Sequence, residues 1–299
     1  MRAGLLLVDK PSGPTSAEVV RRVKARHRPS ALGHLGTLDP MATGILPLCF
    51  EGATRLAPFL LAESKGYRGS IQLGVRTDTL DVTGKILEEV ALPSFEAVAL
   101  GGIAEKLCGP QMQQPPMFSA VRVGGRRLHE LARAGIEVER PAREIRIDML
   151  ELEWLDRVAG LISFRVDCSK GTYVRVLAES IGAGLGVPAA LASLQRFRVG
   201  AFELDECISL EAVLERSTEE LPLLTPAEAL RGSRRLTASL ELAGRIAAGQ
   251  RAALNELAAP EPSEDVGCIM SPAGRLVAVV RASAGAWSLA RVLEREPAD

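Results

Sequence analysis

Residue types that bind metals or form disulfides are scarce in this chain. It has three His, at positions 27, 34 and 129, and an odd number of Cys. No two Cys have CxxC spacing, and no His pair has the spacing or nearby carboxylates of a zinc site. We therefore expect no disulfide framework, no catalytic metal, and free, buried thiols. The five thiols belong to Cys49, Cys108, Cys168, Cys207 and Cys268.

Long apolar runs are also missing. The chain has no stretch of about 18 apolar residues that would span a membrane. Its first residues lack the basic, apolar and small-residue succession of a signal peptide. The hydrophobic fraction of 47% is ordinary for a globular chain, and 299 residues are enough for two domains. These features predict a cytoplasmic protein without a membrane segment.

The net charge is small, at −1, but the two signs are unevenly placed along the sequence. Acidic residues gather between positions 203 and 220, so overall neutrality conceals two basic stretches able to track phosphates. Each stretch taken alone also fits a solvated surface. Their basic residues are Arg21, Arg22, Lys24, Arg26 and Arg28 in the first, and Arg122, Arg126, Arg127, Arg133, Arg140, Arg143 and Arg146 in the second.

One carboxylate, Asp39, stands alone in the run GHLGTLDPMATGILPL at residues 33–48. The glycines of this run, Gly33, Gly36 and Gly44, permit close approach of another chain, and Pro40 fixes the backbone directly after the acid. Such a carboxylate can face a pocket. An Asp-Pro pair also commonly does no more than open a turn, and that interpretation is the better one for this run alone.

The remaining pattern alternates strands and helices. Residues 5–13 predict a strand that runs into a turn, and residues 15–26 predict a helix capped by Ser or Thr. Residues 65–87 indicate an antiparallel meander, and residues 95–107 indicate a helix. Two alternating runs within 145–175 precede a helix that ends in glycines. Grouped strands with helices between them favour a mixed, mainly antiparallel α+β fold over a doubly wound parallel sheet.

Five segments in this order resemble the TruB family of tRNA pseudouridine-55 synthases: the Asp39 run, SKGYRGSIQLG, RTDTLDVTGKI, QQPPMFSAVRVGGRRLHELARAGIEVER and CSKGTYVRVLAESIG. The resemblance covers nearly all of the chain, from LLLVDKPSGPTS onward. It implies an isomerase that converts uridine 55 in the T-loop of tRNA to pseudouridine, with no cofactor. The implied partner is the T-arm of tRNA, and nothing demands more than a monomer.

The resemblance also implies the site residues. Asp39 matches the nucleophile, Arg175 its ion partner, and Tyr67 the ring that stacks on the target uracil. Asp81 either contacts the flipped nucleotide or orders Arg175. The other implied substrate-binding residues are His34, which holds displaced loop nucleotides apart, Tyr173 and Leu194, which line the pocket, and Lys10, which with Pro11 supports its floor.

The domain organisation follows partly from the resemblance. Residues 1–230 match the catalytic domain, and residues of about 111–143 match the insertion that closes over bound RNA. Phe118 and His129 stand in this insertion where many relatives have Tyr. After residue 230, short strands with tight turns predict a small barrel. Residues 236–299 accordingly resemble a PUA-like C-terminal domain that adds contact area, although an independent structural cap fits nearly as well.

The reaction needs the base to leave C1′, rotate and rejoin through C5, without redox change. An ionised carboxylate suffices as nucleophile, adding either to C1′ or to C6 of the ring, and the sequence does not choose between these. A nearby guanidinium would favour the ionised form. Two other classes of protein are alternatives: an aspartyl phosphotransferase, for which no second magnesium-binding carboxylate stands near Asp39, and a tRNA-binding and refolding chaperone without catalysis.

Overall fold

A mixed sheet forms the centre of the larger part of the molecule, in a computed structural model that describes residues 2–95 and 99–293. Ten strands join it in those ranges, in the order β14-β1-β3-β12-β4-β11-β10-β7, with β2 beside β3 and β13 beside β12. The strands are β1 (Gly4–Lys10), β2 (Leu32–His34), β3 (Thr43–Phe50), β4 (Lys65–Leu73), β7 (Gly109–Gln113), β10 (Arg143–Asp156), β11 (Leu161–Cys168), β12 (Ala189–Val199), β13 (Phe202–Glu203) and β14 (Ile208–Ser209).

Most neighbouring strands of this sheet run antiparallel. The exceptions among the described strands are β1 with β14 and β3 with β12, which are parallel. The parallel pairing of β3 and β12 is short, with Thr43 opposite Gln195 and Gly44 opposite Arg196. The predicted mixed, mainly antiparallel α+β fold is confirmed.

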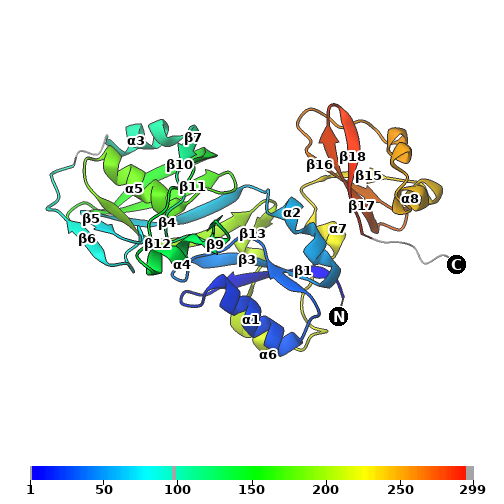
Figure 1. Cartoon of the computed structure of the whole chain (residues 1–299), viewed down its shortest axis with the longest axis horizontal. Helices are drawn as coiled ribbons and strands as arrows, with labels where there is room; N and C mark the ends of the chain where they lie inside the picture. The colour runs from blue at the N-terminus through cyan, green and yellow to red at the C-terminus, as the bar shows by residue number, and fades with distance from the viewer. Residues whose placement is uncertain (1, 96–98, 294–299) are drawn as a thin grey trace.

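Two helices cover one face of the sheet, and a third lies at its other end (Figure 1). The two are α3 (Ala99–Leu107), which packs on β10, and α5 (Val174–Gly184), which packs on β12. The third, α1 (Ser16–His27), is capped by Thr15, whose side chain accepts a hydrogen bond from the Glu18 amide, as the sequence predicts. Of the helix predicted at 95–107, residues 96–98 lie outside the described residues.

Short elements complete the larger part. The segment 65–87 is a meander only in part, because β5 and β6 pair with each other and not with the main sheet. The insertion holds a hairpin of two strands, each two residues long, and a short helix. The helix begins later in the sequence than the RRLHELARA pattern suggests. These elements are η1 (Glu51–Leu56), α2 (Ala57–Leu60), β5 (Val75–Thr77), β6 (Ile86–Glu89), β8 (Arg122–Val123), β9 (Arg126–Arg127), α4 (Leu128–Arg133), η2 (Leu204–Glu206), α6 (Leu210–Glu215) and α7 (Pro226–Ala229).

The C-terminal residues form a second sheet, which Figure 1 shows apart from the first. Its order is β15-β16-β17-β18, with β15 parallel to β16 and the others antiparallel. The two edge strands do not pair with each other, so the described strands form an open sheet and not the closed barrel expected from the sequence. The elements are β15 (Arg234–Thr237), α8 (Leu240–Ala247), η3 (Arg251–Glu256), β16 (Val266–Met270), β17 (Leu276–Ser283) and β18 (Ala286–Val292).

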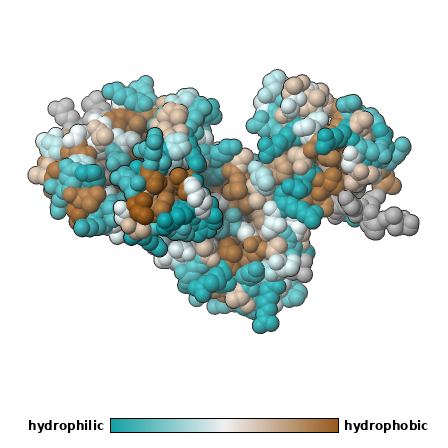
Figure 2. All heavy atoms as spheres, viewed as in Figure 1, coloured by the Kyte–Doolittle hydropathy of each residue, from teal (hydrophilic) through white to brown (hydrophobic). Residues whose placement is uncertain are grey.

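One hydrophobic cluster joins the two sheets. Leu5 and Leu7 of β1 and Cys49 of β3 are buried in the same cluster as Met270 of β16 and Val279 of β17. The C-terminal sheet is therefore packed onto the strands that begin the chain. On the face of the molecule that Figure 2 shows, hydrophilic residues surround separate hydrophobic patches.

The thiols do not all follow the prediction. All five Cys are free, and Cys49, Cys168 and Cys268 are buried. Cys108 is exposed, so the expectation of burial is wrong for it, because it stands just after the end of α3. Across residues 2–95 and 99–293, no three His, Cys, Asp or Glu side chains gather as metal ligands would. In the same ranges no helix is both long and apolar enough to cross a bilayer.

Candidate active site

Asp39 lies on the loop between β2 and β3, and its neighbours anchor that loop to α1. The Ser16 hydroxyl, at the start of α1, donates to the Leu38 carbonyl at 3.1 Å and accepts from the Leu38 amide at 2.8 Å. Leu38 itself is buried in the main core. Leu38 is therefore held both by its hydrogen bonds to Ser16 and by its burial in the core. The side chain of the next residue, Asp39, keeps about a third of its surface exposed.

A buried ammonium group holds the other side of the loop. Lys10 Nζ donates to the carbonyl oxygens of Pro11 at 2.8 Å, Pro40 at 3.1 Å and Ala42 at 2.7 Å. Burial lowers the pKa of Lys10 to about 8, and the charge of Asp39 opposes that shift. The contacts to Pro40 and Ala42 tie Lys10 to the loop just after Asp39.

Arg196 of β12 is a second buried cation at this loop, and the sequence pattern did not single it out. Its Nε donates to the Ile45 carbonyl at 2.8 Å and its Nη2 to the Gly36 carbonyl at 3.1 Å, one on each flank of Asp39. Only 1% of its surface is exposed. In the sequence, Arg196 is marked only by its place in the alternating strand around QRFRV. A guanidinium that is buried in such a strand needs several hydrogen-bond acceptors.

Asp39 and Arg175 form a two-pronged ion pair. Arg175 Nε lies 3.0 Å from Asp39 Oδ2, and Arg175 Nη2 donates to Asp39 Oδ1 at 3.1 Å. Arg175 stands in the first turn of α5 and is 5% exposed. A planar guanidinium and a carboxylate match in this way, which fixes the direction of the carboxylate as well as its charge.

Asp81 completes the surroundings of the guanidinium. Its Oδ2 is 3.8 Å from Arg175 Nη1, which also donates to the Thr79 carbonyl at 2.8 Å. The other oxygen of Asp81 accepts from the Thr79 hydroxyl and from the Thr83 amide, both at 3.0 Å. Asp81 thus organises its own turn and faces Arg175, so of its two expected roles, the ordering of Arg175 has direct geometric support.

Burial and charge act in opposite directions on Asp39. Burial raises the pKa of its carboxyl above the usual range, and the charge of Asp81 adds to the rise. The Arg175 guanidinium is the main influence that lowers this pKa, with a smaller contribution from Lys10. Arg175 therefore favours the ionised form, as expected, but against a desolvation effect that cannot be weighed from the sequence.

A cavity of about 690 Å³ opens over this ion pair. The core contributes Asp39, Asp81, Arg175 and His34 to its wall, and the insertion contributes the opposite side. Three exposed cations line that side. The insertion residues at the cavity include Phe118, Ser119, Arg122, Arg127, His129 and Arg133.

Two polar atoms at this cavity have no hydrogen-bond partner among the described residues. They are His34 Nδ1 and Ser119 Oγ, both shielded from solvent. Burial lowers the pKa of His34, and the nearby Arg196 charge acts in the same direction, so the neutral imidazole is favoured. Buried polar groups are normally paired, so these two atoms are exceptions to that rule among the residues of the cavity wall.

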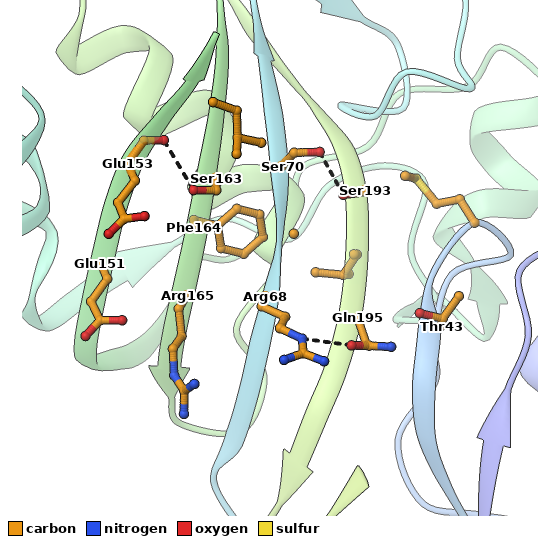
Figure 3. Close-up of a pocket in the computed structure, with 14 residues that line it drawn as sticks. Thr43, Arg68, Ser70, Glu151, Glu153, Ser163, Phe164, Arg165, Ser193 and Gln195 are labelled. Atoms are coloured by element: carbon orange, nitrogen blue, oxygen red, sulfur yellow. Dashed lines mark hydrogen bonds between the residues drawn. The ribbon is translucent and has the colours of Figure 1, made fainter. Parts of the chain in front are cut away.

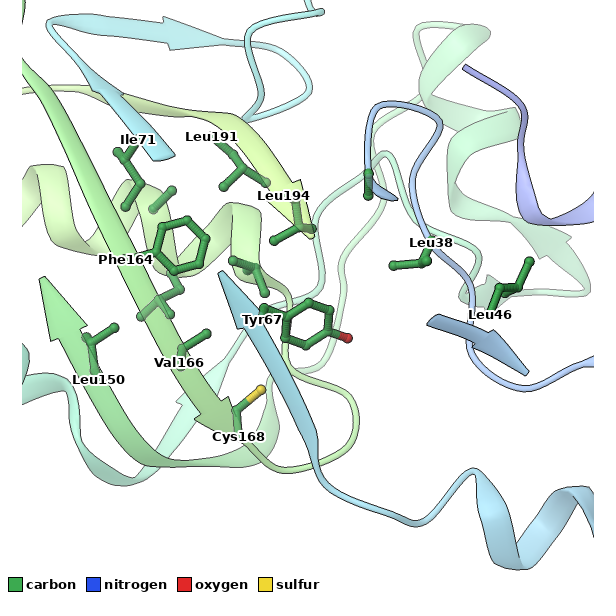
Figure 4. Close-up of a cluster of buried hydrophobic side chains, with 14 of the residues drawn as sticks. Leu38, Leu46, Tyr67, Ile71, Leu150, Phe164, Val166, Cys168, Leu191 and Leu194 are labelled. Carbon is green, nitrogen blue, oxygen red and sulfur yellow. The ribbon is translucent and has the colours of Figure 1, made fainter. Parts of the chain in front are cut away.

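Three of the aromatic and apolar site residues do not line this cavity. Tyr67 is 9% exposed and packs in the core near Leu38 and Leu194; Figure 4 shows its hydroxyl directed to the side where Leu38 lies. Burial raises the pKa of Tyr67, which keeps the hydroxyl protonated. Tyr173 precedes α5, and its amide donates to Gln113 Oε1 at 2.7 Å.

Leu194 lies at a second hollow, of about 640 Å³, on the sheet surface formed by β10, β11, β4 and β12. Figure 3 shows polar side chains along these strands, including Arg68, whose Nε donates to Gln195 Oε1 at 2.8 Å. Met41 and Thr43, just after Asp39, also line this hollow. The two concave surfaces therefore flank the Asp39 loop, one on each side of it.

This sequence is similar to known proteins over most of its length. Residues 23–174 match the model described as TruB family pseudouridylate synthase (N terminal domain). A "tRNA pseudouridine synthase B" of Cupriavidus metallidurans is 39% identical over 297 residues, covering 97% of this chain and 94% of the relative. One of the same name from Psychrobacter cryohalolentis is 43% identical over 261 residues, covering 83% of this chain and 71% of the relative.

Solved structures with the same fold come from protein and RNA complexes. A chain of a Cbf5-Nop10-Gar1 complex matches 98% of this chain and 86% of its own length, with a TM-score of 0.77 and 25% identity. A chain of an H/ACA RNP bound to a substrate RNA containing 2′-deoxyuridine matches with a TM-score of 0.74 over 98% of this chain and 86% of its own. At 23% identity the second match shows the fold alone.

Proposed function

The chain belongs to the TruB family of pseudouridylate synthases and is an isomerase, and we propose that it converts uridine 55 in the T-loop of tRNA to pseudouridine. The relatives named tRNA pseudouridine synthase B support tRNA as the substrate. The observation that carries the proposal is the two-pronged Asp39–Arg175 pair at the base of a cavity whose opposite wall is basic.

Asp39 is the nucleophile in this proposal. Its carboxylate adds to C1′ as the N1–C1′ bond breaks, which keeps the sugar on the protein, or it adds first to C6 of the uracil, which keeps the base on the protein. The base then turns, C5 bonds to C1′, and the bond to Asp39 breaks, which restores the carboxylate. C5 loses its proton and N1 ends with one, so atoms balance and no electron is gained or lost. The pair with Arg175 keeps the carboxylate ionised and aimed into the cavity.

The target nucleotide must leave the RNA stack to reach Asp39, at a cost of a few kcal/mol. We propose that His34 and the insertion receive it. His34 lines the cavity wall, and Arg122, Arg127 and Arg133 supply positive charge for the phosphates. Tyr67 is proposed to stack on the base from the core side, with Leu194 and Tyr173 behind it. Because Tyr67 is buried in this structure, stacking requires the Asp39 loop to shift when tRNA binds.

The finer organisation is also proposed. Residues 1–230 act as the catalytic domain with the insertion at about 111–143. Residues 236–299 act as a PUA-like module that adds RNA contact, held rigidly because it shares a hydrophobic cluster with β1. The enzyme works in the cytoplasm as a monomer on the T-arm of tRNA, without a cofactor.

The test is to incubate the protein with an unmodified tRNA transcript and to map pseudouridine by position. Native protein should modify position 55 and leave a transcript with cytidine there unmodified. Asp39→Asn should lower turnover by about four orders of magnitude or more, while tRNA affinity persists because the substitution removes one charge and little volume. Tight tRNA binding without any pseudouridine in the native protein would instead identify a refolding chaperone.

A further inference from the structure

The insertion takes a direct part in holding the ion pair. Arg175 Nη2 carries two hydrogens, and it donates to two oxygens: Asp39 Oδ1 at 3.1 Å and the backbone carbonyl of Phe118 at 2.7 Å. The Phe118 contact is the shorter of the two. Because a guanidinium is planar, a shift of the Phe118 carbonyl also turns the edge that Arg175 presents to Asp39.

The residue after this carbonyl, Ser119, is held by both the backbone and the side chain of His129. The Ser119 carbonyl accepts two hydrogen bonds from His129 of α4, one from the backbone amide at 3.1 Å and one from ring Nδ1 at 3.0 Å. Ser119 is 6% exposed, and its amide donates to the Met117 carbonyl at 2.9 Å. The Phe118 carbonyl lies in the same planar peptide as the amide and Cα of Ser119, so contacts that hold Ser119 also restrict this carbonyl.

We propose that His129 is a positioning residue for the reaction, acting through Ser119 and Phe118 on Arg175. The inference rests on the proposed function, in which Arg175 orients the nucleophile Asp39. His129 fixes the backbone of the insertion against the guanidinium, so the insertion completes the ion pair as well as covering the cavity. The chain of contacts, from Nδ1 to Asp39 Oδ1, is continuous.

The donor geometry makes the inference specific. In His, Nδ1 is two bonds from Cβ, and in Asn the amide nitrogen is also two bonds from Cβ. Asn at position 129 can therefore donate to the Ser119 carbonyl, whereas Gln places its nitrogen one bond farther out and Ala has no donor. A Tyr hydroxyl stands at the far edge of the ring and also cannot make this contact.

The experiment compares His129→Asn, His129→Gln and His129→Ala under saturating tRNA. Loss of one hydrogen bond that orients the guanidinium should lower kcat about fivefold in the Ala and Gln variants, with tRNA affinity within about twofold of native. The Asn variant should regain most of the native kcat. Melting temperatures of the three variants show whether each is folded. Asn and Gln are a matched pair, because both side chains end in an amide.

Two results would overturn the inference. If all three variants turn over at the native rate, the Nδ1 contact does not position Arg175. If instead the Kd for tRNA rises in all three while kcat stays native, His129 contacts RNA directly from the cavity wall. Failure of the proposed function would give different results. The native protein would then form no pseudouridine, or the Asp39→Asn variant would turn over at the native rate.

Discussion

At the scale of residues, the site is a balance between desolvation and a single guanidinium. Asp39 and Arg175 are 136 positions apart in the sequence, yet their side chains meet at 3.0 and 3.1 Å. The resemblance to a family pairs them correctly. The rise in the pKa of Asp39 could not be predicted from sequence, because it depends on how deeply the loop is buried.

This balance predicts the pH dependence. Turnover requires ionised Asp39 and falls as the pH drops through its pKa, which burial raises, so the acid limb of kcat should lie above the range of an ordinary Asp. Arg175→Met removes the main influence that lowers this pKa, so the limb should move to higher pH. Single-turnover rates measured between about pH 4 and pH 8 check both expectations.

Arg175→Lys is the matched control for that experiment. It keeps the positive charge and loses the two-pronged geometry, so its kcat should fall while its acid limb moves less than that of Arg175→Met. An acid limb at the same pH in the native and Met proteins would mean that Asp39 is not the group whose ionisation governs the rate.

At the scale of elements, the loop between β2 and β3 depends on glycine at one end and not at the other. Gly44 has φ +99°, and a Cβ there would lie 2.2 Å from the Arg196 carbonyl. Gly36 has φ +83° and would meet Arg196 Nη1 at 3.2 Å. Nothing lies within 4 Å of a Cβ at Gly33. The close approach predicted for all three glycines is therefore confirmed at Gly44 and wrong for Gly33.

Gly44→Ala should accordingly destabilise the protein by at least about 2 kcal/mol, because it combines backbone strain with a clash against a backbone atom. Urea unfolding measures the change, and turnover should also fall as the Asp39 loop shifts. Gly33→Ala, eleven positions earlier in the same run, should change the stability by less than about 1 kcal/mol. Equal effects of the two substitutions would contradict this account of the loop.

Elements with a strong local pattern could be predicted, and those set by distant contacts could not. The helix α1 has its Thr15 cap and buried Val19 and Val23, all visible in the sequence. For Arg196, by contrast, the sequence shows only an Arg in an alternating strand, and its carbonyl acceptors beside Asp39 follow from the pairing of β12 with β3. The open C-terminal sheet was mistaken for a barrel because closure depends on pairing between β15 and β18, which short strands and turns do not specify.

At the scale of the whole molecule, the two basic stretches differ in use. In the first, Arg21 and Arg22 pair with Glu18, and Arg26 donates to the backbone carbonyls of Leu214, near the end of α6, and Arg216, just after it. In the second, Arg127 is exposed and lines the cavity over Asp39. Sequence alone shows that both stretches are basic, and only the structure separates cations engaged within the protein from cations facing the cavity.

The salt dependence of tRNA binding should reflect this difference. Substituting Arg126 and Arg127 by Ala should make the plot of log affinity against log salt less steep, because fewer counterions are released on binding. The slope should fall in magnitude by about 0.7 to 0.9 for each phosphate that is no longer neutralised. The control is Ala at Arg21 and Arg22, which removes the same charge from α1. An unchanged slope in the first variant, or an equal change in the control, would place the RNA footprint elsewhere.

The contact between the C-terminal sheet and β1 has a consequence for synthesis. Leu5 and Leu7 leave the ribosome long before Met270 and Val279, which belong to the same buried cluster. The opening strand must also wait for Ile208 of β14 to pair with Val8. Its apolar face thus stays uncovered while the intervening residues are made, and the nascent polypeptide completes this interface only after Val279 has emerged.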